Sequence, residues 1–106
     1  MFAIDINSSN YESEVTRSSI PVLLDVWAPW CGYCKTLAPI IDEIALEHPE
    51  IKVCKLNADE EGEIVKNLGV RGLPTVFVIR DGKIINKNSG VATKHRILAM
   101  LEGATV

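Results

Sequence analysis

The sequence predicts an α/β fold in which a mixed β-sheet is covered by helices on both faces. Two observations support this class. In the first part of the chain, apolar runs typical of buried strands alternate with stretches of helical periodicity. In the last part, a hairpin signal is followed by a final helix. The chain has 106 residues, so we expect one domain that spans residues 1–106.

The first half of the chain is predicted to contain strands and helices in alternation. Phe2 to Ile6 is a short apolar run that predicts a first strand, and Ser9-Asn10-Tyr11-Glu12 has the form of a capping box that opens a short helix. Val22 to Trp27 is apolar apart from Asp25, as expected for a strand covered on both faces. A helix is predicted next, because apolar residues recur at helical spacing: Leu37, Ile40, Ile41, Ile44 and Ala45.

Proline and glycine mark the middle of the chain. Pro39 lies inside the predicted helix and should kink it, since proline removes one backbone hydrogen bond and clashes with the preceding turn. Ile51 to Leu56 predicts the next strand, which ends at Asn57. A short helix from about Glu60 to Leu68 should end at Gly69, because glycine favours the position after a helix C-terminus.

The last third of the sequence predicts a hairpin and a final helix. Thr75 to Ile79 and Lys83 to Asn86 are strand-like and flank Asp81-Gly82, a dipeptide typical of two-residue hairpin turns. Thr93 can cap the final helix, whose inward side chains are Ile97, Leu98 and Leu101.

Composition limits the class of partner and the compartment. The net charge of −3 argues against nucleic acid or an anionic membrane as a partner. No segment approaches the ~20 apolar residues that span a bilayer. The first ten residues lack the basic and long apolar regions of a signal peptide, and three cysteines do not form the even set of a disulfide-rich secreted domain. We therefore expect a reducing, cytoplasmic location.

The segment Trp30-Cys31-Gly32-Tyr33-Cys34-Lys35 carries two thiols where the buried strand passes into the helix. Unpaired N–H groups and the macrodipole at a helix N-terminus favour a thiolate, which is the form that attacks disulfides. A structural disulfide or half of a zinc site is the alternative. Zinc commonly takes four ligands, and only Cys54, His48 and His95 remain, in unrelated elements, so we expect no metal.

Several motifs spread along the chain carry a family resemblance. They are Trp-Cys-x-x-Cys-Lys, Asp25 in the buried strand, Pro39, Lys55-Leu56-Asn57, Gly72-Leu73-Pro74-Thr75 and Gly90. In their order and separations the chain resembles the thioredoxin family from end to end. The resemblance implies the thioredoxin fold, a central five-stranded mixed sheet with three parallel and two antiparallel strands, flanked by four helices.

The resemblance also implies an activity and partners. It suggests a monomeric, general protein-disulfide reductase that carries no cofactor of its own. Its substrates would be proteins with disulfides, and a flavin-dependent thioredoxin reductase that draws on NADPH would keep it reduced.

The two cysteines are expected to have different roles in thiol–disulfide exchange. Cys31, at the first turn of the helix, should be the exposed nucleophile with a lowered pKa. Cys34 lies one helical turn on, so it can resolve the mixed disulfide and, in the resting oxidised state, pair with Cys31. Its pKa should stay higher because it lies deeper.

Asp25 is a charge in an otherwise apolar strand. An unpaired buried carboxylate is costly, so its pKa should be raised. The alternative, an edge position that faces solvent, fits poorly with its neighbours Leu24 and Val26. The resemblance implies a general acid or base that acts on Cys34, with Lys55 as its charge partner. Lys55 could otherwise be a solvated lysine at a strand end.

The resemblance also implies a cis peptide bond between Leu73 and Pro74, and a backbone there that pairs with the substrate like an added strand. Trp30 could instead belong to the core, as Trp27 is expected to, but its place beside Cys31 favours a surface role. The expected small, flat docking surface consists of Trp30, Gly32, Tyr33, Gly72, Leu73, Pro74, Gly90 and Val91.

Two positions depart from the family pattern. Tyr33 stands where relatives usually carry proline. With tyrosine at this position, the Cys-x-x-Cys motif resembles that of glutaredoxins and periplasmic disulfide isomerases. Its N–H is expected to point toward sulfur, stabilise the Cys31 thiolate and raise the reduction potential. Cys54 is an additional cysteine in the middle of a strand, expected to be a buried small hydrophobe rather than a regulatory thiol.

Two alternative functions remain. Tyr33 is compatible with a more oxidising disulfide oxidase or isomerase, which a leader peptide or a high potential would favour. The docking surface is compatible with a redox-independent accessory subunit of a partner enzyme, which would still work with Cys31→Ser and Cys34→Ser.

Overall fold

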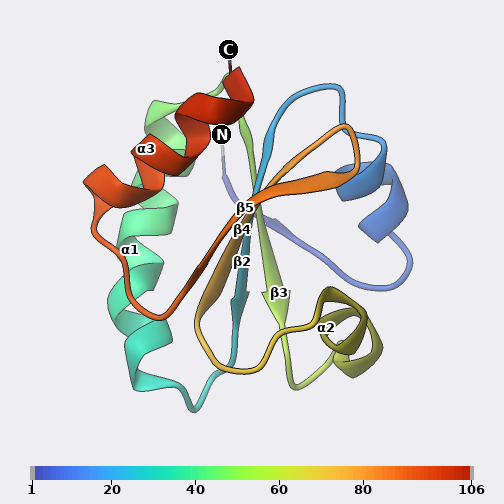
Figure 1. The fold of residues 1–106 in the computed structure, drawn as a ribbon. Coiled ribbons are helices and arrows are strands. Elements are labelled where there is room, and N and C mark those ends of the chain that lie inside the picture. Colours follow the sequence, from blue (N-terminus) through green and yellow to red (C-terminus); the bar gives the residue numbers. More distant parts are fainter. Residues whose placement is uncertain (1, 106) are drawn as a thin grey trace.

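The computed structural model describes residues 2–105, and its elements follow the predicted order (Figure 1). The strands are β1 (Ile4–Asp5), β2 (Val22–Trp27), β3 (Lys52–Asn57), β4 (Thr75–Arg80) and β5 (Lys83–Ser89). The helices are η1 (Glu12–Thr16), a single π-type segment, and α1 (Gly32–Glu47), α2 (Gly62–Leu68) and α3 (Lys94–Thr105).

The five strands form one mixed sheet in the order β1-β3-β2-β4-β5. Strands β1, β3 and β2 are mutually parallel, while β4 is antiparallel to β2 and β5 is antiparallel to β4. Strand β2 is central and almost wholly buried, as its continuous apolar run predicts. The fold class expected from the sequence is confirmed.

Each face of the sheet is covered by a different pair of helices. Figure 1 shows α1 and α3 side by side on one face, with η1 and α2 on the other. Along β2, Leu23 packs in the core beneath α1 and α3, whereas Leu24 and Val26 pack in the core beneath η1 and α2. Because side chains alternate along a strand, Asp25 shares the face of Leu23 and points toward α1.

The N-terminal segment differs from its prediction in two ways. The first strand is shorter than Phe2 to Ile6, since only Ile4–Asp5 pairs as a strand. The expected capping box is wrong, because η1 has no side-chain cap. The Asn7 Oδ1 atom instead accepts hydrogen bonds from the backbone N–H groups of Ser9 (2.8 Å) and Asn10 (3.1 Å), so an Asx turn braces the entry to the helix.

The turns that fix the C-terminal half are those predicted. Asp81 and Gly82 both have positive φ, 54° and 76°, as a two-residue hairpin turn requires. Gly69 ends α2 in the left-handed region. The Thr93 hydroxyl accepts a hydrogen bond from the Arg96 N–H (3.1 Å) and so caps α3.

Candidate active site at the start of helix α1

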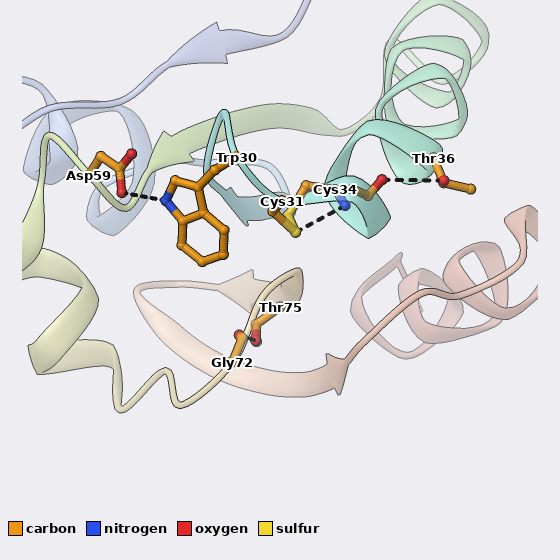
Figure 2. Close-up of a disulfide and its surroundings, with 8 residues drawn as sticks. Trp30, Cys31, Cys34, Thr36, Asp59, Gly72 and Thr75 are labelled. Carbon is orange, nitrogen blue, oxygen red and sulfur yellow. Dashed lines mark hydrogen bonds between the residues drawn. A yellow bond between two sulfur atoms is a disulfide. The ribbon is translucent and has the colours of Figure 1, made fainter.

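The cysteine pair lies where β2 passes into α1. Cys31 occupies the N-cap position of α1 in an extended conformation, and Cys34 lies in the first turn. The two residues form a disulfide, with their Cα atoms 5.2 Å apart (Figure 2). The structure therefore describes the oxidised state of a dithiol pair at a helix N-terminus.

The sulfur of Cys31 accepts a hydrogen bond from the helix. The Cys34 backbone N–H donates to Cys31 Sγ at 3.2 Å (Figure 2). The donor expected from the sequence was the N–H of Tyr33, but the bond that the structure records comes from Cys34. The N-cap atom bonds most readily to the N–H groups of the second and third helical residues, and here it is the third, Cys34, that supplies the bond. Such a donor favours the thiolate of Cys31 once the disulfide is reduced.

Cys31 is less exposed than predicted. The residue is 6% exposed, against 3% for Cys34, because Ala28 and Leu73 pack against the disulfide. The neighbours of the pair are open instead: Trp30 is 69% exposed and Tyr33 71%. The disulfide therefore lies slightly below a surface on which two aromatic side chains are exposed to solvent.

Contacts join the loop before β4 to this surface. The peptide bond between Leu73 and Pro74 is cis, as expected, and Leu73 packs against the disulfide. The Pro74 carbonyl accepts a hydrogen bond from the Gly90 N–H at 2.8 Å. The Thr75 hydroxyl donates to the Gly72 carbonyl at 2.7 Å (Figure 2). The predicted docking segments around residues 72–74 and 90 are thus connected to one another, and Leu73 links them to the cysteines.

The Trp30 ring has a partner that the sequence did not reveal. Its Nε1 donates a hydrogen bond to Asp59 Oδ1 at 3.0 Å, from the loop that follows β3 (Figure 2). The Asp59 N–H in turn donates to Asn57 Oδ1 at 3.0 Å. Asp59 carries no motif, and only the fold brings it beside Trp30.

Asp25 lies beneath the cysteines with one oxygen unpaired. The residue is 2% exposed, and its Oδ1 has no hydrogen-bond partner. Burial raises the pKa of Asp25 from 3.8 to about 7; the positive charge of Lys55 lowers it and the negative charge of Asp42 raises it. A group of this kind changes its protonation near neutral pH.

A cavity of about 140 Å³ connects Asp25 with Cys34. Its lining residues are Asp25, Trp27, Ala28, Pro29, Cys34, Lys35, Ala38 and Lys55. The volume exceeds the roughly 30 Å³ that a water molecule takes in the liquid. The structure thus brings Asp25, Cys34 and Lys55 to one hollow, although they come from three different elements.

The ion pair of Lys55 is made with a residue that the sequence did not suggest. Lys55 and Asp25 are register partners on β3 and β2, so their side chains leave the sheet side by side. The Lys55 Nζ atom nevertheless pairs with Asp42 Oδ1 of α1, at 2.8 Å. Lys55 acts on Asp25 through its charge, while its direct partner is Asp42.

Cys54 is a separate, buried thiol. It lies in β3 on the face covered by η1 and α2, fully buried among Leu24, Leu56 and Phe77. Burial raises the pKa of Cys54 to about 12. It therefore behaves as the small hydrophobe that was expected.

Residues 2–105 contain no group of three or more histidine, cysteine, aspartate or glutamate side chains placed to hold a metal ion. No helix within these residues has the length and apolar character that crossing a membrane requires.

A mixed five-stranded sheet with a disulfide-forming Cys-x-x-Cys pair at a helix N-terminus defines a thiol–disulfide oxidoreductase. The family model described as thioredoxin matches residues 2–103. The thioredoxin of Pseudomonas aeruginosa is 38% identical over 100 residues, which cover 93% of each chain.

Two other relatives are similar. The thioredoxin of Haemophilus influenzae is 40% identical over 95 residues, covering 89% of each chain. The chloroplastic M-type thioredoxin of Chlamydomonas reinhardtii is 40% identical over 98 residues, covering 92% of this chain and 70% of that one. The chain belongs to the thioredoxin family and is a protein-disulfide reductase of that family.

Proposed function

We propose that the chain is a general protein-disulfide reductase in which Cys31 is the nucleophile, Cys34 resolves the intermediate and Asp25 moves the proton. The observation that carries this proposal is the hydrogen bond from the Cys34 N–H to Cys31 Sγ at the N-terminus of α1. It selects Cys31 as the sulfur on which negative charge is stabilised.

The reaction begins with the reduced protein. The Cys31 thiolate attacks one sulfur of the target disulfide, the target's second sulfur leaves as a thiolate and takes a proton from water, and a mixed disulfide joins Cys31 to the target. Three atoms define the step: the attacking, central and leaving sulfurs. Leu73 packs beside Cys31, so the target chain next to its disulfide meets this loop first.

The second step releases the target and regenerates the disulfide. Ionised Asp25 accepts the proton of the Cys34 thiol through water in the cavity that both residues line. The Cys34 thiolate attacks Cys31 Sγ, the mixed disulfide breaks, and the departing target thiolate takes the proton. Two electrons pass from the dithiol to the target. The pKa of Asp25 of about 7 suits both directions of this transfer.

Docking uses the surface defined by Trp30, Gly32, Tyr33, the 72–74 loop and the 90–91 loop. The backbone beside Leu73 offers hydrogen bonds to an extended target segment, as an added strand does. Trp30, Tyr33 and the 45% exposed Val91 supply the apolar contacts. A surface that binds through backbone hydrogen bonds and apolar contacts, rather than through one particular side chain of the target, suits many targets.

The electron donor is expected to be a flavin-dependent thioredoxin reductase that uses NADPH, and the protein works as a monomer in a reducing compartment such as the cytoplasm. Support comes from the family, whose chemistry needs re-reduction after every turnover. The unpaired Cys54 also fits a compartment in which thiols stay reduced.

The test is covalent trapping. Cys34→Ser should accumulate mixed disulfides with target proteins, because the resolving thiol is absent, whereas Cys31→Ser should accumulate none. Alkylation of the reduced protein at neutral pH should modify Cys31 faster than Cys34. If Cys34 reacts faster, or Cys31→Ser traps targets, the assignment of roles is wrong.

A second function, a more oxidising oxidase or isomerase, is motivated by the exposed Tyr33 within the active-site turn. The equilibrium potential of the Cys31–Cys34 couple in a glutathione buffer separates the two. A potential well below that of the glutathione pool supports the reductase, and one above it supports the oxidase.

A further inference from the structure

Lys55 stands between two hollows of the molecule. On its inner side is the cavity of about 140 Å³ that it shares with Asp25 and Cys34. On its outer side is an open groove of about 330 Å³, lined by Phe2, Ala3, Asp5, Asp42, Leu46 and Lys55. The ammonium group of Lys55 can therefore lean toward the buried carboxylate or toward the surface.

The structure shows which side it takes. Lys55 Nζ lies 2.8 Å from Asp42 Oδ1, and Asp42 is an exposed residue in the middle of α1. Asp25, next to Lys55 across the β2–β3 pair, keeps its Oδ1 without a partner. Neighbouring parallel strands lie about 4.8 Å apart, so the lysine stem starts close to Asp25 and its charged end is drawn away from it.

We propose that Asp42 is a positioning residue: it holds the Lys55 ammonium toward the outer groove, so that the Asp25 carboxyl remains unpaired and available to exchange a proton with Cys34. The inference rests on the proposed role of Asp25. It adds an exposed helix residue, outside the docking surface, to the machinery of the second step.

The electrostatics of the site act in the same direction. The negative charge of Asp42 raises the pKa of Asp25, and the positive charge of Lys55 lowers it. The remaining charged groups near this arrangement are Lys35, which lines the inner cavity, and Asp5, which lines the outer groove. Without Asp42, the lysine would be free to pair with Asp25, and a cation within about 4–6 Å lowers a carboxyl pKa by about 1–3 units.

The experiment is a pH titration of the Asp25 carboxyl by carbon-13 NMR in the full-length oxidised protein, combined with the pH profile of disulfide reduction. Asp42→Asn should move the Asp25 midpoint to lower pH by about one unit or more, and move the rising limb of the pH profile with it. Asp42→Glu should keep both close to the parent values, because it can still pair with Lys55.

Glu43→Gln is the matched control. Glu43 is the next residue on α1, and Glu43→Gln removes the same negative charge as Asp42→Asn. Its ion-pair partner, however, is Lys94 of α3. We expect its Asp25 midpoint to stay within about 0.3 units of the parent, as for a screened surface charge. If Glu43→Gln and Asp42→Asn shift the midpoint equally, a general surface field explains the effect and the proposal is wrong.

A double-mutant cycle tests whether Lys55 carries the effect. In a Lys55→Met background, Asp42→Asn should shift the Asp25 midpoint far less than in the parent. An undiminished shift contradicts the proposal, as does an Asp42→Asn midpoint equal to that of the parent. A separate result, an Asp25 that titrates at its ordinary acidic value in the parent protein, would overturn the proposed role of Asp25 itself.

Asp5 provides the second variant. It pairs in register with Lys55 from β1 and has the same sign as Asp42. If Asp42 is the residue that holds the lysine, Asp5→Asn leaves the Asp25 midpoint close to the parent. A shift in Asp5→Asn that matches the Asp42→Asn shift would assign the role to the groove as a whole and overturn the assignment to Asp42.

Discussion

Two regions of the molecule bury cysteine, and they do so with opposite chemical results. Cys31 and Cys34 lie at the junction of β2 and α1, 6% and 3% exposed, and Cys54 lies in the middle of β3, fully buried. Exposure alone barely separates them. The surroundings do: Cys31 receives a helix N–H and Cys34 lines a cavity together with the Asp25 carboxyl, whereas Cys54 has Leu24, Leu56 and Phe77 around it.

The difference lies in the hydrogen-bond donors and ionisable groups near each thiol, which together with exposure control how readily a thiolate forms. At the junction, an N–H group donates a hydrogen bond to Cys31 Sγ, and the Asp25 carboxyl lines the same cavity as Cys34. In β3, burial outweighs the opposing charge of Lys52 and raises the pKa of Cys54 to about 12. At pH 8 Cys54 is then almost entirely the neutral thiol.

The largest expected effect comes from removing one sulfur of each region. Cys31→Ser should bring disulfide reduction down to the uncatalysed level, because serine is not ionised at neutral pH and cannot form the mixed disulfide. Cys54→Ser should leave the turnover rate within about twofold. The measurement is reduction of a protein disulfide coupled to NADPH oxidation. An equal loss of activity in both variants would contradict the difference between the Cys31–Cys34 pair and Cys54.

The next effect is on stability and concerns Asp25. Burial raises its pKa from 3.8 to about 7, and at about 1.4 kcal/mol per pH unit this corresponds to a destabilisation of about 4 kcal/mol. A raised pKa leaves folding unaffected below pH 3.8, where both states are protonated. The cost grows as the pH rises from 3.8 to about 7 and is complete above that.

Asp25→Asn should therefore stabilise the fold by up to about 4 kcal/mol at pH 8 and by little at pH 3.5, while it slows turnover. Denaturant unfolding at the two pH values measures the first part, and the coupled assay measures the second. An Asp25→Asn protein that is less stable at pH 8 and equally active would contradict both parts.

A smaller effect is expected at Tyr33, within the reactive region alone. Proline there would remove an N–H from the first turn of α1, weaken the support for the Cys31 thiolate and lower the reduction potential. Because the recorded hydrogen bond to Cys31 Sγ comes from Cys34, we expect a decrease of no more than about 30 mV, equivalent to about 1.4 kcal/mol for two electrons.

Equilibration with glutathione measures the Tyr33→Pro shift, and the absorbance of the thiolate against pH shows whether Cys31 ionises at higher pH in the same variant. Tyr33→Phe, which keeps the N–H, is the control and should match the parent. An increase in potential for Tyr33→Pro would leave Tyr33 as a substrate contact only.

The smallest effect is expected in the inert region. Cys54→Ala removes one buried sulfur and should cost about 1 kcal/mol of stability, with no change in potential. Native Cys54 should resist alkylation until the protein unfolds. Rapid modification of Cys54 in the folded protein would show that β3 opens locally and would weaken the contrast between the regions.

Much of the fold could be predicted because single residues decide it locally. The positive φ values of Asp81 and Gly82, the end of α2 at Gly69 and the buried run of β2 follow from turn chemistry and hydrophobic patterning. The capping box failed because Asn7, two residues upstream of Ser9, offers the backbone a competing acceptor.

The candidate site was predictable in its residues but not in all its partners. Cys31, Cys34 and Asp25 were expected together from the motif and from one charge in an apolar strand. The pairing of Lys55 with Asp42, and of Trp30 with Asp59, depends on how a helix and a loop lie against the sheet. No local pattern encodes a contact between residues so far apart in the sequence.

The hydrogen bond between Trp30 and Asp59 has a consequence for the proposed docking of a target protein. An exposed indole would ordinarily sample several orientations and would lose that freedom on contact. Anchored at its nitrogen, and with Asp59 itself tied to Asn57, the ring is already in place before a target arrives. In the proposed docking, most of the conformational entropy lost on binding is then lost by the target. A small contact area can therefore hold the target while Cys31 Sγ attacks its disulfide.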